Sequence, residues 1–138
     1  MQNELLERER VQSIIGAFYE VYNYYGFGLA ESVYAGALER EPLDRGHEVA
    51  REVAVSVFTR GWHIGWQRLD MLVDRKIIVE NKATEKLPAI ALPQLISYLQ
   101  ATPYEVGLLL HFGPKPHFEK RVHTDKRPFV RPAVNTPL

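Results

Sequence analysis

Residues 68–83 read RLDMLVDRKIIVENKA. The pattern predicts two extended segments joined by a tight turn at residues 74–75, because a polar pair between apolar runs is typical of a β-hairpin. The β-branched residues at 77–79 fit a buried strand. Such a strand would normally continue with apolar side chains, yet this one runs into Glu80 and Lys82.

The two charged residues at the end of this strand should lie on one side of the sheet. Side chains alternate along a strand, so Glu80 and Lys82 point the same way, roughly 7 Å apart. A hairpin register brings Asp70 close to both. Burying such charges is costly unless they pair or bind a metal, which favours a functional site. The alternative is a hairpin whose charged end emerges into water, and this short pattern alone leaves both open.

The composition is that of a globular protein with one domain. The chain has 138 residues and no cysteine, so it is long enough for a hydrophobic core, and disulfides, thiolate-bound metals and cysteine nucleophiles are excluded. A metal held by oxygen ligands is still open. No apolar run reaches membrane-spanning length and the charged N-terminus is unlike a signal peptide. We therefore expect a cytoplasmic protein.

Charge is unevenly distributed, although 17 basic and 17 acidic side chains sum to zero. Residues 1–48 carry a net charge of −5 and residues 113–138 a net charge of +4. The basic end could meet phosphates or be a solvated tail. We expect one domain over residues 1–123 and a proline-rich basic tail over residues 124–138. The five histidines show no paired metal spacing, and we expect them at the surface or at strand ends.

Apolar periodicity predicts three helices. The first should cover about residues 4–25, with Asn3 as its N-cap and Gly26 as its stop. The second should run from about residue 30 to residue 41, because a proline follows. The third should cover about residues 90–102, with its proline inside the first turn.

Alternating and continuous apolar segments predict five strands, the last one at an edge, over residues 49–58, 62–73, 76–83, 106–110 and 118–122. Gly65 is expected to mark a bulge. Antiparallel strands followed by a crossover helix and a buried strand indicate an α/β fold with a central mixed sheet flanked by helices.

Several separated motifs occur in a specific order. They are GLAESVY at 28–34, with the spacing GxxExxY; LDMLV at 69–73, leading into VENKA at 79–83; QLISYL at 94–99; and GLLLHFG at 107–113, followed by KRV at 120–122. In this order and spacing the chain resembles the GxxExxY protein family, a branch of the PD-(D/E)XK nuclease-like superfamily. The resemblance spans roughly residues 10–123.

The resemblance implies a restriction-endonuclease-like core with a metal site. Asp70 and Glu80 would ligate a divalent metal, Lys82 would be the catalytic lysine, and Glu31 would be the acidic residue from the N-terminal helix. Metal chemistry is consistent with this, because Mg²⁺ or Mn²⁺ prefers oxygen ligands. The backbone carbonyl of Asn81 could add a third ligand, and Glu31 could add one directly or through water. Such a metal would polarise a phosphodiester and lower the pKa of a bound water.

The resemblance also implies that Gln94 and Tyr98 form the helical Gln-x-x-x-Tyr element of exonuclease-like members. They could hold phosphate oxygens or orient the acidic ligands. The alternative is an ordinary packed helix face. His111 stands where the family commonly has asparagine.

Three functions remain open from the sequence. The first is a divalent-metal-dependent nuclease, with DNA rather than RNA as the expected partner. The second is an inactive nucleic-acid-binding or accessory module on the same fold. The third is a protein-interaction or small-ligand domain in which Asp70, Glu80 and Lys82 form a buried ion network. A homodimer stays open in each case.

Overall fold

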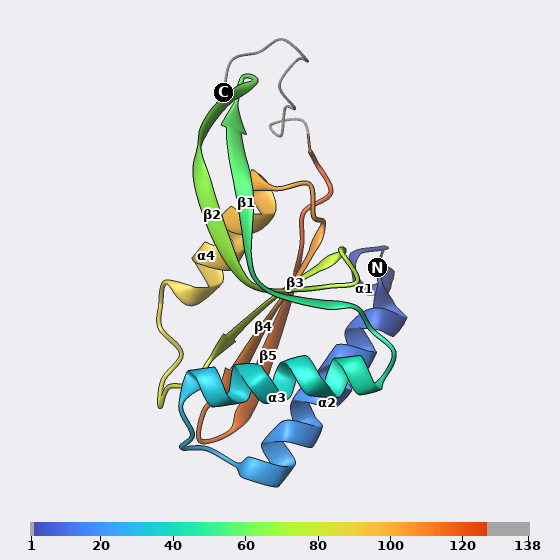
Figure 1. Ribbon diagram of the computed structural model, residues 1–138, viewed down its shortest axis with the longest axis vertical. Coiled ribbons are helices and arrows are strands. Elements are labelled where there is room, and N and C mark those ends of the chain that lie inside the picture. The colour runs from blue at the N-terminus through green and yellow to red at the C-terminus, as the bar shows by residue number, and fades with distance from the viewer. Residues whose placement is uncertain (1, 127–138) are drawn as a thin grey trace.

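The computed structural model describes residues 2–126, in which helices cover both faces of one five-stranded sheet (Figure 1). In chain order the elements are α1 (Gln2–Leu5), α2 (Arg8–Tyr25), α3 (Glu31–Asp44), β1 (Val49–Thr59), β2 (Trp62–Val73), β3 (Ile77–Lys82), α4 (Ala91–Ala101), β4 (Val106–Phe112) and β5 (Pro116–Val122). The predicted fold class, a mixed sheet flanked by helices, is confirmed.

The sheet has the order β1-β2-β3-β4-β5. Neighbouring strands are antiparallel except β3 and β4, which are parallel and joined by the crossover helix α4. All of β4 is buried, as are residues 77–81 of β3, because these central strands are covered on both faces. The carboxyl end of β3, where the predicted site begins, therefore lies in the middle of the sheet.

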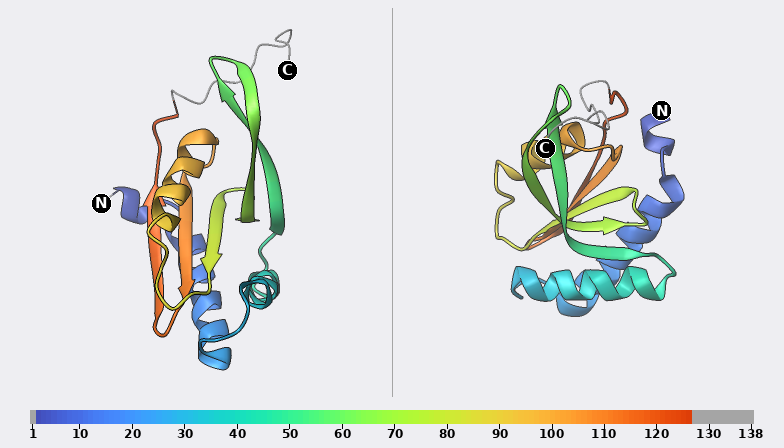
Figure 2. Two further views of the ribbon diagram at one scale, coloured as in Figure 1. Left: turned by 90° about the vertical axis from the view of Figure 1, so that its left-hand side faces the viewer. Right: turned by 45° about the horizontal axis from the view of Figure 1, so that its top comes forward.

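Two hydrophobic clusters pack against opposite faces of the sheet. Helices α2 and α3 lie on one side and α4 on the other (Figure 2). Strand alternation divides β3 between them: Val79 joins the cluster that contains Phe18 and Phe112, whereas Ile78 joins the cluster that contains Leu95. Glu80 follows the alternation of Ile78 and so belongs to the α4 side.

The first helix is broken, so the prediction of one helix over residues 4–25 is wrong. Glu7 has a left-handed backbone (φ 55°) that separates α1 from α2. The Nζ of Lys120, on β5, donates to the carbonyl of Leu6 at 2.7 Å, so this carbonyl is satisfied without a continuous helix. Asn3 lies inside α1 and does not cap a helix.

Helix α3 continues past the point where we predicted its end. Pro42 lies inside it, and the helix ends at Asp44 rather than near Glu41. Pro42 lacks an N–H and so costs the helix one hydrogen bond. The turn after it is still closed, because the carbonyl of Glu41 accepts the N–H of Arg45 at 3.2 Å and that of Pro42 accepts the N–H of His47 at 3.0 Å.

Strands β1 and β2 extend beyond the rest of the sheet as a two-stranded arm, which we define as residues 53–69. Strand β2 pairs with β3 only through residues 71–73, so the arm pairs only with itself (Figure 1). The register shifts opposite Gly65 and leaves Ile64 without a partner, which confirms the predicted bulge.

The basic tail falls mostly outside the described residues, which end at residue 126. The division into a domain over residues 1–123 and a tail over 124–138 therefore stays a prediction. Within residues 2–126, no helix combines the length and the hydropathy needed to cross a membrane.

Candidate active site

The two predicted acidic ligands lie where β2 and β3 separate. Met71 and Val79 are the last paired residues, and the next positions are Asp70 and Glu80. Glu80 Oε2 accepts the backbone N–H of Asp70 at 2.8 Å, and Asp70 Oδ2 accepts the backbone N–H of Asn81 at 3.4 Å. Each carboxyl group thus satisfies an N–H of the opposite strand at the fork. The structure brings this pair together as the hairpin register predicts.

Burial makes both groups hard to ionise, and the charge of Asp70 makes Glu80 harder still to ionise. Burial, with the charge of Asp70 as the next cause, raises the pKa of Glu80 to about 8. Burial also raises the pKa of Asp70, although the N–H of Asn81 and the charge of Lys82 oppose this shift. Two adjacent carboxyl groups that repel one another are stabilised by a shared cation. The donor set therefore suits a hard divalent ion.

Lys82 lies on the same side of β3 as Glu80. Its positive charge lowers the pKa of both Asp70 and Glu80. Within residues 2–126 it forms no direct ion pair with either carboxyl group, and its side chain is only half-buried. Its amine is thus near the pair and not committed to it.

Glu31 connects the start of α3 to the end of β3. Its Oε1 accepts the backbone N–H of Ala83 at 3.0 Å, and its backbone carbonyl accepts the side-chain amide of Asn81 at 3.3 Å. Its charge contributes to the raised pKa of Asp70. Glu31 therefore lies beside the carboxyl pair, but one of its oxygens is used to hold the β3 terminus.

The contacts of Tyr34 explain the tyrosine of the GxxExxY spacing. Its hydroxyl donates to the carbonyl of Gly26 and accepts the N–H of Leu29 at 3.2 Å. Its fully buried ring stacks on Phe112 with centroids 4.0 Å apart. Tyr34 thereby holds the loop before α3 against β4, and this fixes the position of Glu31.

The predicted pair on α4 faces the site. Tyr98 is buried, and its burial raises its pKa. The charges of Glu80 and Asp70 raise this pKa further, whereas a side-chain hydrogen bond with Gln94 lowers it.

His111 pairs with Lys82 across the parallel ladder and is also buried. Its Nε2 lies 2.8 Å from the carbonyl of Thr84. It fixes the segment that follows β3.

A cleft of about 200 Å³ opens at the fork and is lined by Glu31, Ser32, Ala35, Arg51, Glu52, Asp70 and Asn81. Within residues 2–126 no group of three or more His, Asp or Glu side chains is placed to hold a metal ion. A metal here would therefore use the Asp70 and Glu80 carboxylates with a backbone carbonyl and water, which suits Mg²⁺ because it usually retains several waters.

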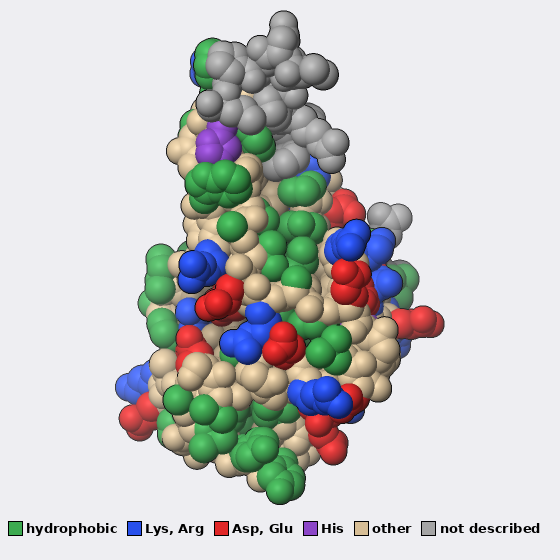
Figure 3. Space-filling model, in the orientation of Figure 1, with side chains coloured by type: hydrophobic (Ala, Val, Ile, Leu, Met, Phe, Trp, Pro, Cys, Tyr) green, Lys and Arg blue, Asp and Glu red, His purple; other side chains and the backbone are tan. Residues whose placement is uncertain are grey.

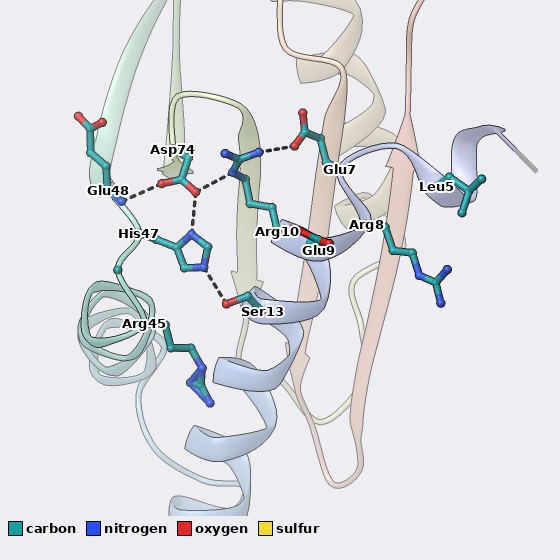
Figure 4. Close-up of a pocket in the computed structure, with 11 residues that line it drawn as sticks. Leu5, Glu7, Arg8, Glu9, Arg10, Ser13, Arg45, His47, Glu48 and Asp74 are labelled. Atoms are coloured by element: carbon teal, nitrogen blue, oxygen red, sulfur yellow. Dashed lines mark hydrogen bonds and ion pairs between the residues drawn. The ribbon is translucent and has the colours of Figure 1, made fainter.

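A cavity of about 970 Å³ lies at the opposite end of β3 (Figure 4). There Ser13 Oγ lies 2.7 Å from His47 Nε2, and His47 Nδ1 lies 2.6 Å from Asp74 Oδ2. Asp74 also accepts Arg10 Nε at 2.7 Å and the N–H of Glu48 at 2.8 Å. The expectation that all histidines lie at the surface or at strand ends missed this cluster. The Val49–Val73 register, which places Glu48 opposite Asp74, was the available signal.

This cluster has the order of a hydrolase triad, but its surroundings indicate a brace. Ser13 lies inside α2, where the helix uses the neighbouring backbone N–H groups, so none is free for an oxyanion. Arg10 shares the oxygen of Asp74 that contacts His47. The cluster ties α2, the α3–β1 connection and the β2–β3 turn together, at a distance from the carboxyl pair.

The mixed sheet flanked by helices, together with two acidic residues and a lysine at the β2–β3 fork, indicates a nuclease-like protein. The model of the PD-(D/E)XK nuclease superfamily matches residues 8–123, and the chain belongs to this superfamily. The solved structure described as "Crystal structure of SSO0001" has a similar fold, with a TM-score of 0.51 and 19% identity. The match covers 88% of this chain and 62% of that chain. A comparison with curated proteins gave no match.

Proposed function

We propose that this protein is a divalent-metal-dependent nuclease that hydrolyses phosphodiester bonds of DNA, in the GxxExxY branch of its superfamily. The observation that carries the proposal is the pair of carboxyl groups at the β2–β3 fork, one buried (Glu80) and one partly buried (Asp70), with Glu80 Oε2 2.8 Å from the backbone nitrogen of Asp70 and the amine of Lys82 nearby. A structural ion network would gain little from two adjacent like charges. A metal site requires them.

Each residue has a role that follows from its position. Asp70, Glu80 and the Asn81 carbonyl would hold Mg²⁺ or Mn²⁺, which when bound would polarise the phosphodiester and acidify a water. Lys82 would stabilise the negative charge that builds on the phosphate oxygens. Glu31 would hold the end of β3 and accept a bound water.

Gln94 and Tyr98 complete the proposed arrangement from α4. Tyr98 is close enough to Asp70 and Glu80 for their charges to raise its pKa. It would therefore stay a neutral donor at physiological pH, oriented by Gln94, and hold a carboxylate or a phosphate oxygen in place.

Cleavage of labelled oligonucleotides tests the proposal. Single- and double-stranded DNA and RNA are incubated with the protein and Mn²⁺, Mg²⁺ or EDTA. We expect metal-dependent cleavage that falls at least 100-fold in Lys82→Ala and in Asp70→Asn, whereas Lys86→Ala, in the exposed loop after β3, is the matched control. Cleavage in EDTA, or cleavage unchanged by Lys82→Ala, would overturn the proposal.

Thermal melts separate the metal site from an ion network. A metal that binds only the folded state stabilises it, by about 2.7 kcal/mol at a hundred times its Kd. We expect Mn²⁺ at millimolar concentration to raise the melting temperature of the wild type but not of an Asp70→Asn, Glu80→Gln double variant. Equal shifts in both proteins would place the metal elsewhere.

A further inference from the structure

The arm carries the most exposed large apolar side chains of the sheet. Trp62 and Trp66, the two tryptophans of the chain, are 55% and 68% exposed. His63 packs against Phe58 and Trp66, with ring centroids 5.5 Å and 5.0 Å apart. Figure 3 shows hydrophobic side chains along the upper part of the molecule, over β1 and β2. A cluster of exposed aromatic rings of this kind marks a binding surface.

The charge of the arm differs from that of the whole chain. Residues 53–69 contain Arg60 and Arg68 but none of the 17 acidic residues of this neutral chain. Among residues 2–126 the ion pair of Arg68 is with Glu52, at 3.9 Å, and both side chains are about 70% exposed, so this pair is weak. Arginines and exposed aromatic rings on an arm that has no acidic residue of its own suit a polyanion that carries flat rings.

The arm leads directly to the fork. Side chains two residues apart share one side of a strand, so Trp66 and Arg68 lie on the same side of β2, and Asp70 follows two residues after Arg68. Four residues separate Trp66 from Asp70, a distance of about 13 Å along the strand. Glu52 and Asp70 line the same cleft. A ligand that lies along the outer side of the arm therefore reaches the carboxyl pair.

We propose that the outer side of the arm, which carries Trp66 and Arg68, binds single-stranded nucleic acid, with an unpaired base stacked on Trp66 and a phosphate next to Arg68. In a duplex the faces of the bases are stacked inside the helix, so tryptophan rings can stack only on unpaired bases. The inference rests on the proposed function, because the strand held by the arm is the substrate whose phosphodiester reaches Asp70 and Glu80.

Tryptophan fluorescence reports on the arm directly, because both tryptophans lie on it. The full chain is titrated with a single-stranded 20-mer of thymidine, and then with a 20-bp duplex, in EDTA at low salt. We expect quenching that saturates with the single strand and an affinity at least tenfold weaker for the duplex. Absence of quenching with the single strand would overturn the inference, as would equal affinity for both.

Variants identify the side chains involved, with affinity measured by anisotropy of a labelled single strand. We expect Trp66→Ala to weaken binding about tenfold or more and Trp66→Phe to retain most of it, because one stacking ring remains. Arg68→Ala should reduce the salt dependence by about one counterion. Tyr24→Ala, which removes an exposed ring on α2, is the control and should bind like the wild type. Binding that is unaffected by Trp66→Ala would overturn the inference.

The arm and the nuclease proposal can fail separately. Fluorescence quenching that persists in Lys82→Ala, with no cleavage by the wild type, would support the arm and overturn the nuclease. Metal-dependent cleavage that is insensitive to Trp66→Ala would do the reverse. If sedimentation shows self-association that Trp66→Ala abolishes, and no strand binds, then the arm is an interface between copies of the chain and the inference is wrong.

Discussion

Replacement of Glu80 by glutamine tests the electrostatic cost of the fork. The side chain is 5% exposed, and its pKa is about 8 against an ordinary value of 4.5. Because the folded-state pKa is the higher one, the contribution of Glu80 to stability is complete below about pH 4.5 and is lost as the pH rises to about 8. Glutamine does not titrate, and its carbonyl oxygen can still accept the N–H of Asp70.

The pKa difference gives the size of the effect. From pH 4.5 to pH 8 is about 3.5 units, and at about 1.36 kcal/mol per unit this is at most about 5 kcal/mol. Water in the cleft at the fork will reduce it, so we expect a few kcal/mol between pH 5 and pH 8.5. For a chain of this size, one kcal/mol corresponds to roughly 3–5 °C in melting temperature.

Urea unfolding at a series of pH values measures this difference. The wild type and Glu80→Gln are compared from pH 5 to pH 8.5 in EDTA, and the free energy of unfolding is obtained from each curve. We expect the wild type to lose stability across this range relative to Glu80→Gln and the variant to be the more stable protein at pH 8.5. Glu85→Gln, in the exposed loop after β3, is the matched control and should follow the wild type.

The reasoning would be refuted by a variant that follows the wild type in parallel across the whole range. That result would mean that Glu80 is ionised at neutral pH in the folded protein without a cation. The fork would then tolerate two adjacent carboxylates, and the electrostatic argument for a metal would be lost.

Three further predictions concern the surrounding framework. Asp74→Asn should lower the free energy of unfolding by about 1–3 kcal/mol at pH 7. Although burial opposes the shift, hydrogen bonds with His47, Glu48 and Arg10 hold the pKa of Asp74 below its usual range. The stabilisation by Asp74 is therefore present above the ordinary pKa of an aspartate and should shrink as acid protonates the folded protein, and an equal loss at pH 7 and in strong acid would contradict this. Tyr34→Phe should cost about 1–3 kcal/mol because Gly26 and Leu29 lose their partner, and it should also reduce cleavage through Glu31; an unchanged melting temperature would show that the loop does not need the hydroxyl. Gly107→Ala should lower the free energy of unfolding by about 1–3 kcal/mol, because the new Cβ would lie 2.7 Å from Leu95 Cδ1. Gly36→Ala in α3 is its control in the same urea assay. Nothing lies within 4 Å of the new Cβ there, so this variant should be neutral or stabilising.

The strands could be predicted from the sequence because their information is local. The bounds of β2 agree with the prediction, and the polar pair at residues 74–75 does form the turn, with φ values of 54° and 55°. The connection spans residues 74–76, because Val73 pairs with Ile77, and this three-residue loop sets the register in which Asp70 comes opposite Glu80. The pattern of buried side chains in β3 and β4 follows from their apolar runs in the same way.

The parts that could not be predicted depend on contacts between distant residues. The break after α1 involves Lys120, which is 114 residues from Leu6 in the chain. Pro42 does not end α3 where it stands, because the N–H groups of Arg45 and His47 close the turn that follows it. His47 gains its partners from α2 and from the β2–β3 turn, and no local pattern around it indicates either of them.

The position of Asp70 unites the two functional ideas about β2. The strand takes part in the central sheet through residues 71–73 and in the arm through residues 62–69, and Asp70 lies between these two regions. If β2 and β3 kept pairing beyond Met71, their backbone groups would satisfy one another and the carboxyl groups would have no cleft to face. Because the arm leaves the sheet at this point, the unpaired N–H groups turn to Glu80 and Asp70 instead. The departure of the arm from the sheet therefore opens the site and also makes the outer side of the arm begin at the site. A nucleic-acid strand held by the arm would for this reason lie beside the carboxyl pair.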